Sequence, residues 1–389
     1  MNRKPTATSC DVLILGAGMS GLALASQIAS YNNKKPNCQK STIIIEPRTN
    51  YEEDRTWCYW KKSNSFFDSA ITHKWHKWKI CSQGKTYISK YSNIPYVRVN
   101  SSIYYKLAQK FLEKSNGIRL INGVSAKEVL PFTDKVIVKY DDLSINSKYV
   151  YDTRPKDIPD DTLLQHFGGL EIKTASDTFN TEVVTLMDFQ ITKGDDIHFF
   201  YILPFSTKHA LVETTHFSKN HLSKDAYKFE IERYLRNSLH LKNWQIVREE
   251  YGVIPMYKNA PTLKYRKFNN IIPLGLHANT TRPSTGYCYP HAQKQALDYS
   301  KSLSIGNPTL KKADRNVLVR WLDMIFISFL ENHPQKADAM FMNLFRKTSS
   351  EALINFLSDD AKFCDYMNVI MAMPKKTFIY EALRCVIKP

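Results

Sequence analysis

Residues 10–28 read CDVLILGAGMSGLALASQI, an apolar run that leads through three glycines into a segment with helical periodicity. The run at residues 12–15 is typical of a buried strand. Gly16 is expected to form the tight turn after it, Gly18 to let the backbone approach a pyrophosphate, and Gly21 to let helix and strand pack closely. The N-terminus of the helix would then face the phosphates. The segment therefore predicts the first β-α unit of a dinucleotide-binding, Rossmann-like domain.

A second apolar strand, residues 41–45, ends at Glu46, the acidic residue expected to bind a ribose hydroxyl. The intervening loop, residues 32–40, is long, so this acid falls later in the chain than usual. A glycine-rich turn without a ligand is the alternative interpretation. The order strand, turn, helix, strand favours dinucleotide binding over that alternative.

A single carboxylate, Glu213, interrupts the apolar and aromatic stretch FFYILPFSTKHALVETTHFS at residues 199–218. Its β-branched and aromatic content predicts strand, and alternation places Glu213 on the same face as Leu211 and Phe217. Desolvation there would raise the pKa of the carboxyl and favour a proton donor. The alternative is a carboxylate at a strand edge that reaches water or pairs with a lysine.

Six segments in fixed order resemble the lycopene cyclase family of carotenoid-forming flavoproteins, in its bacterial form. They cover most of the chain, from about residue 10 to the helical C-terminus. The segments are DRTWCYW at 54–60, YVYDTRP at 149–155, LLQHFGGLEI at 163–172, YILPFSTKHALVETTHFS at 201–218, YGVIPM at 251–256 and RPSTGY at 282–287.

The resemblance implies a flavin adenine dinucleotide, active in its reduced form and without net redox change, with NAD(P)H as the reductant. It implies lycopene and other linear carotenoids as substrates, β rings as products, and Glu213 as the carboxylate required for catalysis. The residues that it assigns to the cofactor, besides the three glycines and Glu46, are Arg55, Asp152, Arg154, Gly275 and Gly286. This chain departs from the family at Ala278 and Asn279, where a pair of glycines is usual, so side chains there would crowd the flavin.

Cyclisation passes through carbocations, which aromatic rings stabilise by cation–π interactions. The candidate aromatic residues near the motifs are Trp57, Tyr59, Trp60, Phe200 and Tyr201. For each of them, packing in the core is the alternative.

The net charge of +17 is concentrated in residues 61–110, which hold ten basic residues and one acid, Asp68. Within this block, HKWHKWK at residues 73–79 interleaves basic side chains with Trp75 and Trp78, which are expected to be exposed. This composition favours contact with an anionic membrane. An ordinary solvated face and a nucleic-acid site are the alternatives, and the second is not expected.

The seven cysteines form no close pair, which indicates free thiols in a reducing compartment, and no zinc-ligand spacing is present, so no metal is expected. The polar N-terminus gives no sign of a signal peptide, and no apolar run reaches the length of a membrane span. A cytoplasmic protein, soluble or peripherally attached to a membrane, is expected.

The expected fold class is α/β: an FAD/NAD(P)-binding Rossmann-like flavoprotein fold with an inserted antiparallel-sheet substrate domain and a helical C-terminus. We expect residues 8–60, 101–155 and 251–306 to form the cofactor domain, 61–100 and 156–250 the substrate domain, and 307–389 the helical region. An apolar stripe in that region indicates packing core or the roof of a lipid-facing tunnel; it comprises Trp321, Leu322, Ile325, Phe326 and Phe329.

Two other functional classes stay open on the sequence. A redox flavoprotein, such as an aromatic hydroxylase or an isoprenoid reductase, would share the N-terminal motif but would change the mass of its substrate. A non-catalytic carotenoid or lipid carrier would account for Ala278 and Asn279. The number of cyclised ends, the choice of β or ε ring, and the oligomeric state also stay open.

Overall fold

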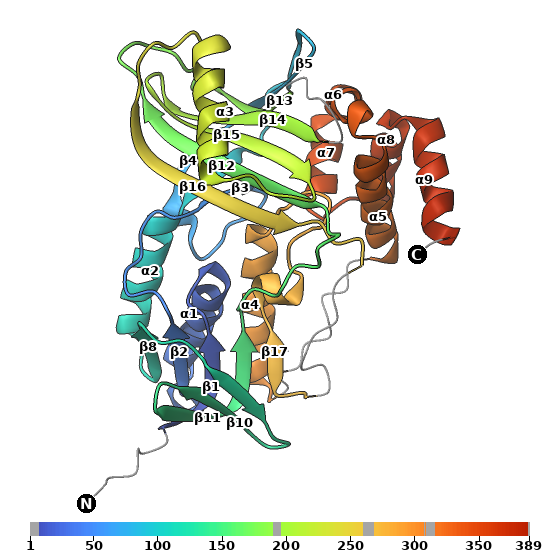
Figure 1. Cartoon of the computed structure of the whole chain (residues 1–389). Helices are drawn as coiled ribbons and strands as arrows, with labels where there is room; N and C mark the ends of the chain where they lie inside the picture. The colour runs from blue at the N-terminus through green and yellow to red at the C-terminus, as the bar shows by residue number, and fades with distance from the viewer. Residues whose placement is uncertain (1–7, 190–195, 260–267, 307, 309–315, 388–389) are drawn as a thin grey trace, which may run out of the picture.

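The computed structural model describes residues 8–189, 196–259, 268–306, 308 and 316–387. The Rossmann-like sheet occupies the lower half of Figure 1, with β1 at its centre between β2 and β11, parallel to both. Residues 12–15 are buried, as their continuous apolar run predicts for a central parallel strand. The strands of this sheet are β1 (Thr8–Leu15), β2 (Thr42–Glu46), β8 (Ile118–Asn122), β9 (Glu128–Pro131), β10 (Val136–Tyr140), β11 (Leu143–Asp152) and β17 (Ile271–Pro273).

The glycine-rich turn joins β1 to helix α1 (Met19–Lys34), which packs against α2 (Ser101–Glu113) and α4 (Tyr289–Ser304). Gly16 has a φ of +99°, which favours glycine, and a Cβ at Gly21 would lie 2.0 Å from the Gly16 carbonyl oxygen. These two positions bring α1 against the sheet in the way that the motif predicts.

The second, larger sheet lies above the first in Figure 1 and is covered on one face by α3 (Lys224–Asn237). Its strand order is β16-β12-β15-β14-β13-β5-β6. The bounds are β5 (Lys77–Ser82), β6 (Lys85–Ile88), β12 (Leu164–Lys173), β13 (Val183–Phe189), β14 (Ile197–Ser206), β15 (His209–Ser218) and β16 (Gln245–Pro255). Strand β16 pairs with β12 along its length, so residues 251–255 lie in this sheet, although the sequence analysis assigns them to the cofactor domain.

A three-stranded sheet connects the two larger ones, in the order β3 (Thr56–Trp60), β7 (Tyr96–Asn100) and β4 (Ile71–Trp75). Residues 56–60 therefore pair outside the Rossmann-like sheet, because pairing with β7 rather than order in the chain places them. The expectation that Trp75 and Trp78 are exposed is wrong: both are buried in the core beneath the larger sheet. The alternation of HKWHKWK is that of half-buried strands, with tryptophan inward and lysine outward.

The C-terminal region is helical, as expected, although Asn307, its predicted start, lies outside the described residues. Its helices α5 (Val317–Asn332), α6 (Ala337–Lys347), α7 (Ser350–Leu357), α8 (Phe363–Ala372) and α9 (Lys375–Ile387) lie at one end of the larger sheet (Figure 1). Short 3₁₀ turns occur at Pro36–Cys38, Asp68–Ala70, Gly275–Ala278 and Pro334–Lys336. Phe329 and Phe341 pack with Phe217 of β15 in one apolar core. Within the described part of the chain, every helix is too short or too polar to cross a bilayer.

Candidate active site

A single cavity of about 1050 Å³ extends from the glycine-rich turn, past the larger sheet, to the C-terminal helices. This volume lies at the upper end of the range typical of small-molecule sites. Gly18 and Arg48 line one end, Glu213 and Phe217 the middle, and Met371 and Ile379 the other end. Four residues of the predicted apolar stripe also line it, namely Trp321, Leu322, Ile325 and Phe326, whereas Phe329 is packed in the core.

The end of the cavity at the glycine-rich turn has the features of a dinucleotide site. A Cβ at Gly18 would meet only the Arg48 side chain, at 3.9 Å, so the backbone is accessible from the cavity. Glu46 accepts hydrogen bonds from the backbone N–H of Ala17 (2.5 Å) and from Nε of Arg48 (2.8 Å). Burial alone would raise the pKa of Glu46, but these hydrogen bonds lower it, so the group is ionised at the end of β2, behind Arg48 and not in the cavity lining.

The other residues assigned to the cofactor lie around this end at different depths. Arg55 is exposed and lines the cavity. Asp152 is fully buried at the end of β11, where Nε and Nη2 of Arg154 donate to its carboxylate at 2.9 and 2.7 Å, so this pair is satisfied internally. A Cβ at Gly275 would lie 2.3 Å from Oγ of Ser20 in the first turn of α1.

Gly286 lines the cavity, whereas the two residues that depart from the family do not. Asn279 has a left-handed backbone, with a φ of +55°, and its side chain accepts from Nζ of Lys156 at 3.4 Å. Ala278 precedes it at the end of a 3₁₀ turn. Both residues therefore lie behind the cavity wall, and their side chains leave its volume open.

The side chains of Glu213 on β15 and Glu250 on β16 meet over a glycine of β12, the strand between them. Strand β12 lies between β15 and β16, and Gly169 pairs with Glu213 on one side and with Glu250 on the other. The two backbones are two strand spacings apart, about 9.5 Å. A Cβ at Gly169 would lie 2.9 Å from Cγ of Glu213 and 3.1 Å from Cγ of Glu250. The missing side chain thus lets the two carboxyl groups approach and form a hydrogen bond.

The two glutamates differ in protonation. Burial, followed by the hydrogen bond and charge of Glu250, raises the pKa of Glu213 well above its ordinary value. Burial would also raise the pKa of Glu250, but the hydrogen bond from Glu213 and the Arg248 guanidinium lower it. Two adjacent buried carboxyl groups share one proton, because ionising both would place two negative charges side by side. Glu213, which lines the cavity, is the protonated member of the pair.

An ionic network behind Glu250 explains this asymmetry. Arg248 forms a salt bridge with Glu250 and another, of 3.1 Å, with Glu171. Thr56 of β3 donates to Glu250 at 2.9 Å and accepts from Arg248 at 3.0 Å. Arg98 adds a second guanidinium, bound to Glu53 and stacked on the Phe205 ring. The positive charge therefore lies on the Glu250 side, away from the cavity.

The predicted aromatic residues divide between the cavity and the core. Trp57 and Tyr201 line the cavity, whereas Tyr59 stacks on Tyr289 with ring centroids 5.2 Å apart. Trp60 packs against Trp78 and Tyr96 in the core. Phe200 does not belong to the site: it lies on the opposite face of the sheet and stacks on Tyr234 of α3 at 3.9 Å. The alternation of β14 places Phe200 and Tyr201 on opposite faces.

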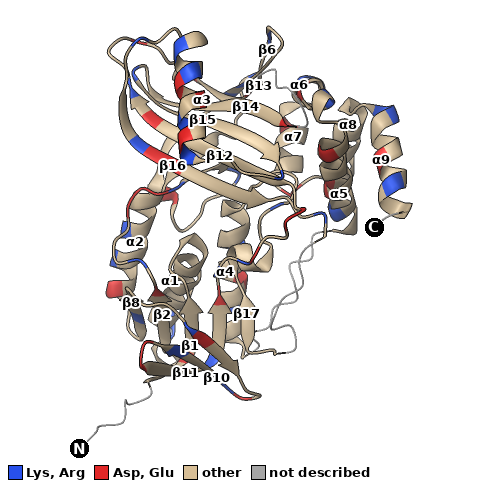
Figure 2. Ribbon diagram, in the orientation of Figure 1, with Lys and Arg blue, Asp and Glu red and all other residues tan. Residues whose placement is uncertain are grey.

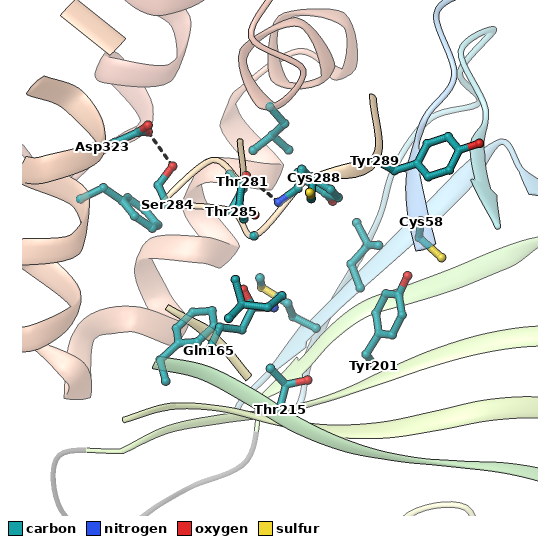
Figure 3. A pocket seen from close by; sticks show the side chains of 18 of the residues that line it. Cys58, Gln165, Tyr201, Thr215, Thr281, Ser284, Thr285, Cys288, Tyr289 and Asp323 are labelled. Atoms are coloured by element: carbon teal, nitrogen blue, oxygen red, sulfur yellow. Dashed lines mark hydrogen bonds between the residues drawn. The ribbon is translucent and has the colours of Figure 1, made fainter. Parts of the chain in front are cut away.

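A row of hydroxyl groups beside Glu213 was not anticipated from the sequence. Tyr201, opposite Glu213 in the sheet, donates to the Tyr96 hydroxyl at 3.1 Å, and Tyr96 lies 3.5 Å from that of Tyr287. Cys58 points toward Tyr201 (Figure 3), and burial raises the pKa of its thiol to about 12. These groups are neutral, so they line the site with polarity and aromatic surface but without charge.

Glu250 is the residue of this candidate site that the sequence analysis missed. It stands beside the YGVIPM motif, but nothing in the local pattern separates it from Glu249, which is bonded to Lys228 at the surface. The one available sign was Gly169 in LLQHFGGLEI, but its role becomes clear only when the strands on either side of it are known.

The larger sheet holds a second buried polar cluster on its α3 face. His198, His216 and Glu230 are the one group of potential metal ligands among the described residues. Hydrogen bonds already connect them: His216 bridges Asp196 (2.6 Å) and Glu230 (2.8 Å), and Thr214 donates to Glu230 at 2.8 Å. The expectation of no metal stays a prediction.

Comparison with known proteins gives a consistent result. The profile of the family described as Lycopene cyclase protein matches residues 11–382. A chloroplastic neoxanthin synthase from Solanum lycopersicum is 26% identical over 298 residues, which are 71% of this chain and 57% of that protein. A lycopene beta-cyclase from Paracoccus sp. (strain N81106 / MBIC 01143) is 31% identical over 162 residues, 40% of each chain. The chain thus matches little more than half the length of the first of these relatives.

Solved structures share the fold at low identity. A geranylgeranyl bacteriochlorophyll reductase-like protein from Thermoplasma acidophilum has a TM-score of 0.65 and 12% identity, over 96% of this chain and 98% of its own. CtdE, solved in complex with FAD and a substrate, has a TM-score of 0.58 and 12% identity, over 93% of this chain and 99% of its own. The chain therefore has the Rossmann-like fold of FAD-dependent flavoproteins.

Proposed function

The chain belongs to the lycopene cyclase family, and from that premise we propose that it is a lycopene beta-cyclase, which converts the linear ends of lycopene to β rings without net oxidation. The observation that carries the proposal is a neutral, buried Glu213 facing an apolar cavity and hydrogen-bonded to an ionised Glu250. A carboxyl that stays protonated at neutral pH is the group required to protonate a carbon–carbon double bond.

Ring closure begins when Glu213 gives its proton to the terminal double bond of the polyene. The tertiary cation that results is attacked by the next double bond, and the ring cation then loses a proton from the adjacent carbon. One proton is gained and one is lost, so the product is an isomer. Trp57 and Tyr201 line the cavity and would stabilise the cations through their ring faces.

Glu250 sets the protonation of the donor. Deprotonation of Glu213 leaves two carboxylates facing each other, and this like-charge repulsion keeps the proton on Glu213 until the step in which it passes to the substrate. The Arg248 guanidinium keeps Glu250 ionised before and after that step. The negative charge of the pair also lies close to the ring cation, which it stabilises.

The residues present fit an FAD. Gly18 offers accessible backbone at the N-terminus of α1, and Glu46 is ionised at the end of β2. Gly18 and Arg48, which binds Glu46, line the end of the cavity that continues to Glu213. The flavin, when bound in its reduced form, would supply negative charge and a basic nitrogen beside the ring cation. NAD(P)H is the proposed reductant, and the substrate class is lycopene and other linear carotenoids.

We place the enzyme in the cytoplasm, attached peripherally to an anionic membrane, because a hydrocarbon substrate partitions into lipid. The apolar lining of the cavity and the net charge of +17 support this placement.

Pigment analysis of a lycopene-accumulating host that expresses this chain tests the proposal. The expected products are γ-carotene and then β-carotene, both with the mass of lycopene, and purified protein should carry FAD. Gly18→Val should lose the FAD and the activity together, because its side chain occupies the path of the pyrophosphate.

The same experiment separates the alternatives. A product of altered mass would identify a redox flavoprotein. Unchanged lycopene that copurifies with folded protein lacking a flavin spectrum would identify a carrier. Either result would refute the cyclase proposal.

A further inference from the structure

The C-terminal helices expose apolar side chains in stripes at helical spacing. On α9, the exposed apolar residues lie at positions 379, 380, 383, 386 and 387, and on α8 at 363, 367, 370 and 371. Helix α5 adds positions 317, 318 and 321. Spacings of three, four, seven and eight residues put each set on one side of its helix. Phe363 and Ile387 are 77% and 76% exposed, far more than a helix packed in a protein core would show.

The polarity of α9 is reversed relative to that of an ordinary surface helix. Its carboxylate, Glu381, is fully buried and accepts hydrogen bonds from Ser328 (2.7 Å) and Asn332 (3.0 Å) of α5. Leu383 and Val386 point to the outside instead. A helix with its polar contacts inside and its apolar stripe outside is stabilised by an apolar environment at that outer face.

The exposed charged residues of α8 and α9 are all basic. Lys375, Lys376 and Arg384 of α9 are exposed, whereas Asp365 of α8 and Glu381 are buried. In Figure 2, α8 is almost entirely uncharged and α9 carries basic positions. An apolar surface flanked by exposed lysine and arginine matches an anionic lipid bilayer.

The same surface contains one end of the cavity. Trp321, Ile370, Met371 and Ile379 each line the cavity and are also exposed, by 37%, 39%, 56% and 61%. These side chains come from all three helices, so the cavity reaches the outside between α5, α8 and α9. A molecule dissolved in lipid at this surface has a continuous apolar path to Glu213.

We propose that the outer faces of α5, α8 and α9 form the surface by which the protein docks on an anionic bilayer, with the mouth of the cavity opening into the lipid. The proposal rests on the action on a membrane-borne polyene argued above, and it replaces the basic block at residues 61–110 as the membrane contact. Trp75 and Trp78, the tryptophans of HKWHKWK, are buried and so cannot anchor that segment in a membrane.

Sedimentation with vesicles tests the surface without turnover. Wild-type protein should bind vesicles of phosphatidylcholine with 30% phosphatidylglycerol more tightly than pure phosphatidylcholine, and the difference should shrink as salt rises. The double variant Leu383→Glu/Val386→Glu places two carboxylates on the stripe without altering a residue that lines the cavity. Its binding should fall at least about tenfold.

Two control variants give the test its specificity. Phe229→Glu makes the same kind of change at an exposed aromatic residue of α3 and should bind as wild type does. The triple change of Lys74, Lys77 and Lys79 to Gln addresses the basic block and should weaken binding much less than the double variant. Circular dichroism and thermal melting report whether each variant is folded.

The outcomes separate the two proposals. The double variant should lose activity on lycopene in vesicles and keep it on lycopene dispersed in detergent. Two results would overturn the docking surface and leave the cyclase proposal intact. One is wild-type protein that binds neither kind of vesicle, and the other is an equal loss of binding in the double variant and in Phe229→Glu. Specific vesicle binding with no cyclisation in either medium would leave the surface and refute the cyclase.

Discussion

Strand β15 carries a buried ionisable group on each face of the larger sheet, and the neighbours on the two faces have opposite effects on protonation. On the cavity face, the nearest ionisable neighbour of Glu213 is another acid, Glu250, so one carboxyl is kept neutral. On the α3 face, His216 lies between two acids, Asp196 and Glu230, and its pKa is raised to about 9 although burial lowers it.

The difference shows that burial alone does not fix protonation. Both groups are almost inaccessible to solvent, yet the sign of the neighbouring charge keeps the acid protonated in one case and the base protonated in the other. The α3 face is a closed network of paired charges, which stabilises the fold. The cavity face has a protonated carboxyl that borders an apolar space, which is the arrangement for a proton donor.

Removing the proton on the cavity face should have the largest effect. Glu213→Gln keeps the shape of the side chain but has no acidic proton, so cyclisation should fall by about 10²- to 10⁴-fold. FAD content, read from flavin absorbance, should stay near that of wild type.

The matched control is Glu230→Gln, which neutralises a partly buried acid of α3 that contacts the opposite face of the same sheet. It should lower thermal stability and leave the activity per folded molecule unchanged. If Glu213→Gln keeps its activity, another group donates the proton, and the proposed difference between the two faces is wrong.

The ionic network behind the site should set the pH dependence. Activity requires protonated Glu213, so the rate should fall as pH rises through the apparent pKa of the pair. Glu250→Gln removes the neighbouring negative charge that raises the pKa of Glu213, and the alkaline limb should move to lower pH. Arg248→Gln removes the cation that lowers this pKa, and the limb should move to higher pH.

Rate profiles of the two variants, at saturating substrate, measure these shifts. Opposite displacements cannot come from a general loss of structure, which lowers the rate at every pH. Displacements in the same direction would show that the pair does not control the donor.

The sequence predicted the parts of the site that depend on local patterns. The glycine spacing indicates the Rossmann-like turn, and the alternation around Glu213 indicates an acid with Leu211 and Phe217 on its face. The same alternation would have excluded Phe200, which is adjacent to Tyr201 and so faces α3.

The rest depends on strand order and register, which local patterns do not specify. Glu250 meets Glu213 only because β12 lies between their strands with Gly169 at the point of contact. Trp78 lies in the core because β5 joins the larger sheet through β13, a pairing between segments about a hundred residues apart, and Trp75 lies there because β4 pairs with β7.

The smallest effect is expected on the α3 face, in stability rather than in activity. The pKa of His216 is about 9 in the folded protein and about 6.5 when unfolded, so its stabilising contribution is complete below pH 6.5 and is lost as pH rises through 9. At 1.36 kcal/mol per unit, the contribution is about 3 kcal/mol.

Urea unfolding near pH 6 and near pH 10 should therefore show a larger loss of stability in wild type than in His216→Gln. The exposed His221, changed to Gln, is the matched control and should follow wild type. Equal pH dependence in wild type and His216→Gln would mean that the histidine is neutral in the folded protein, and the two faces of β15 would then not differ in the way described.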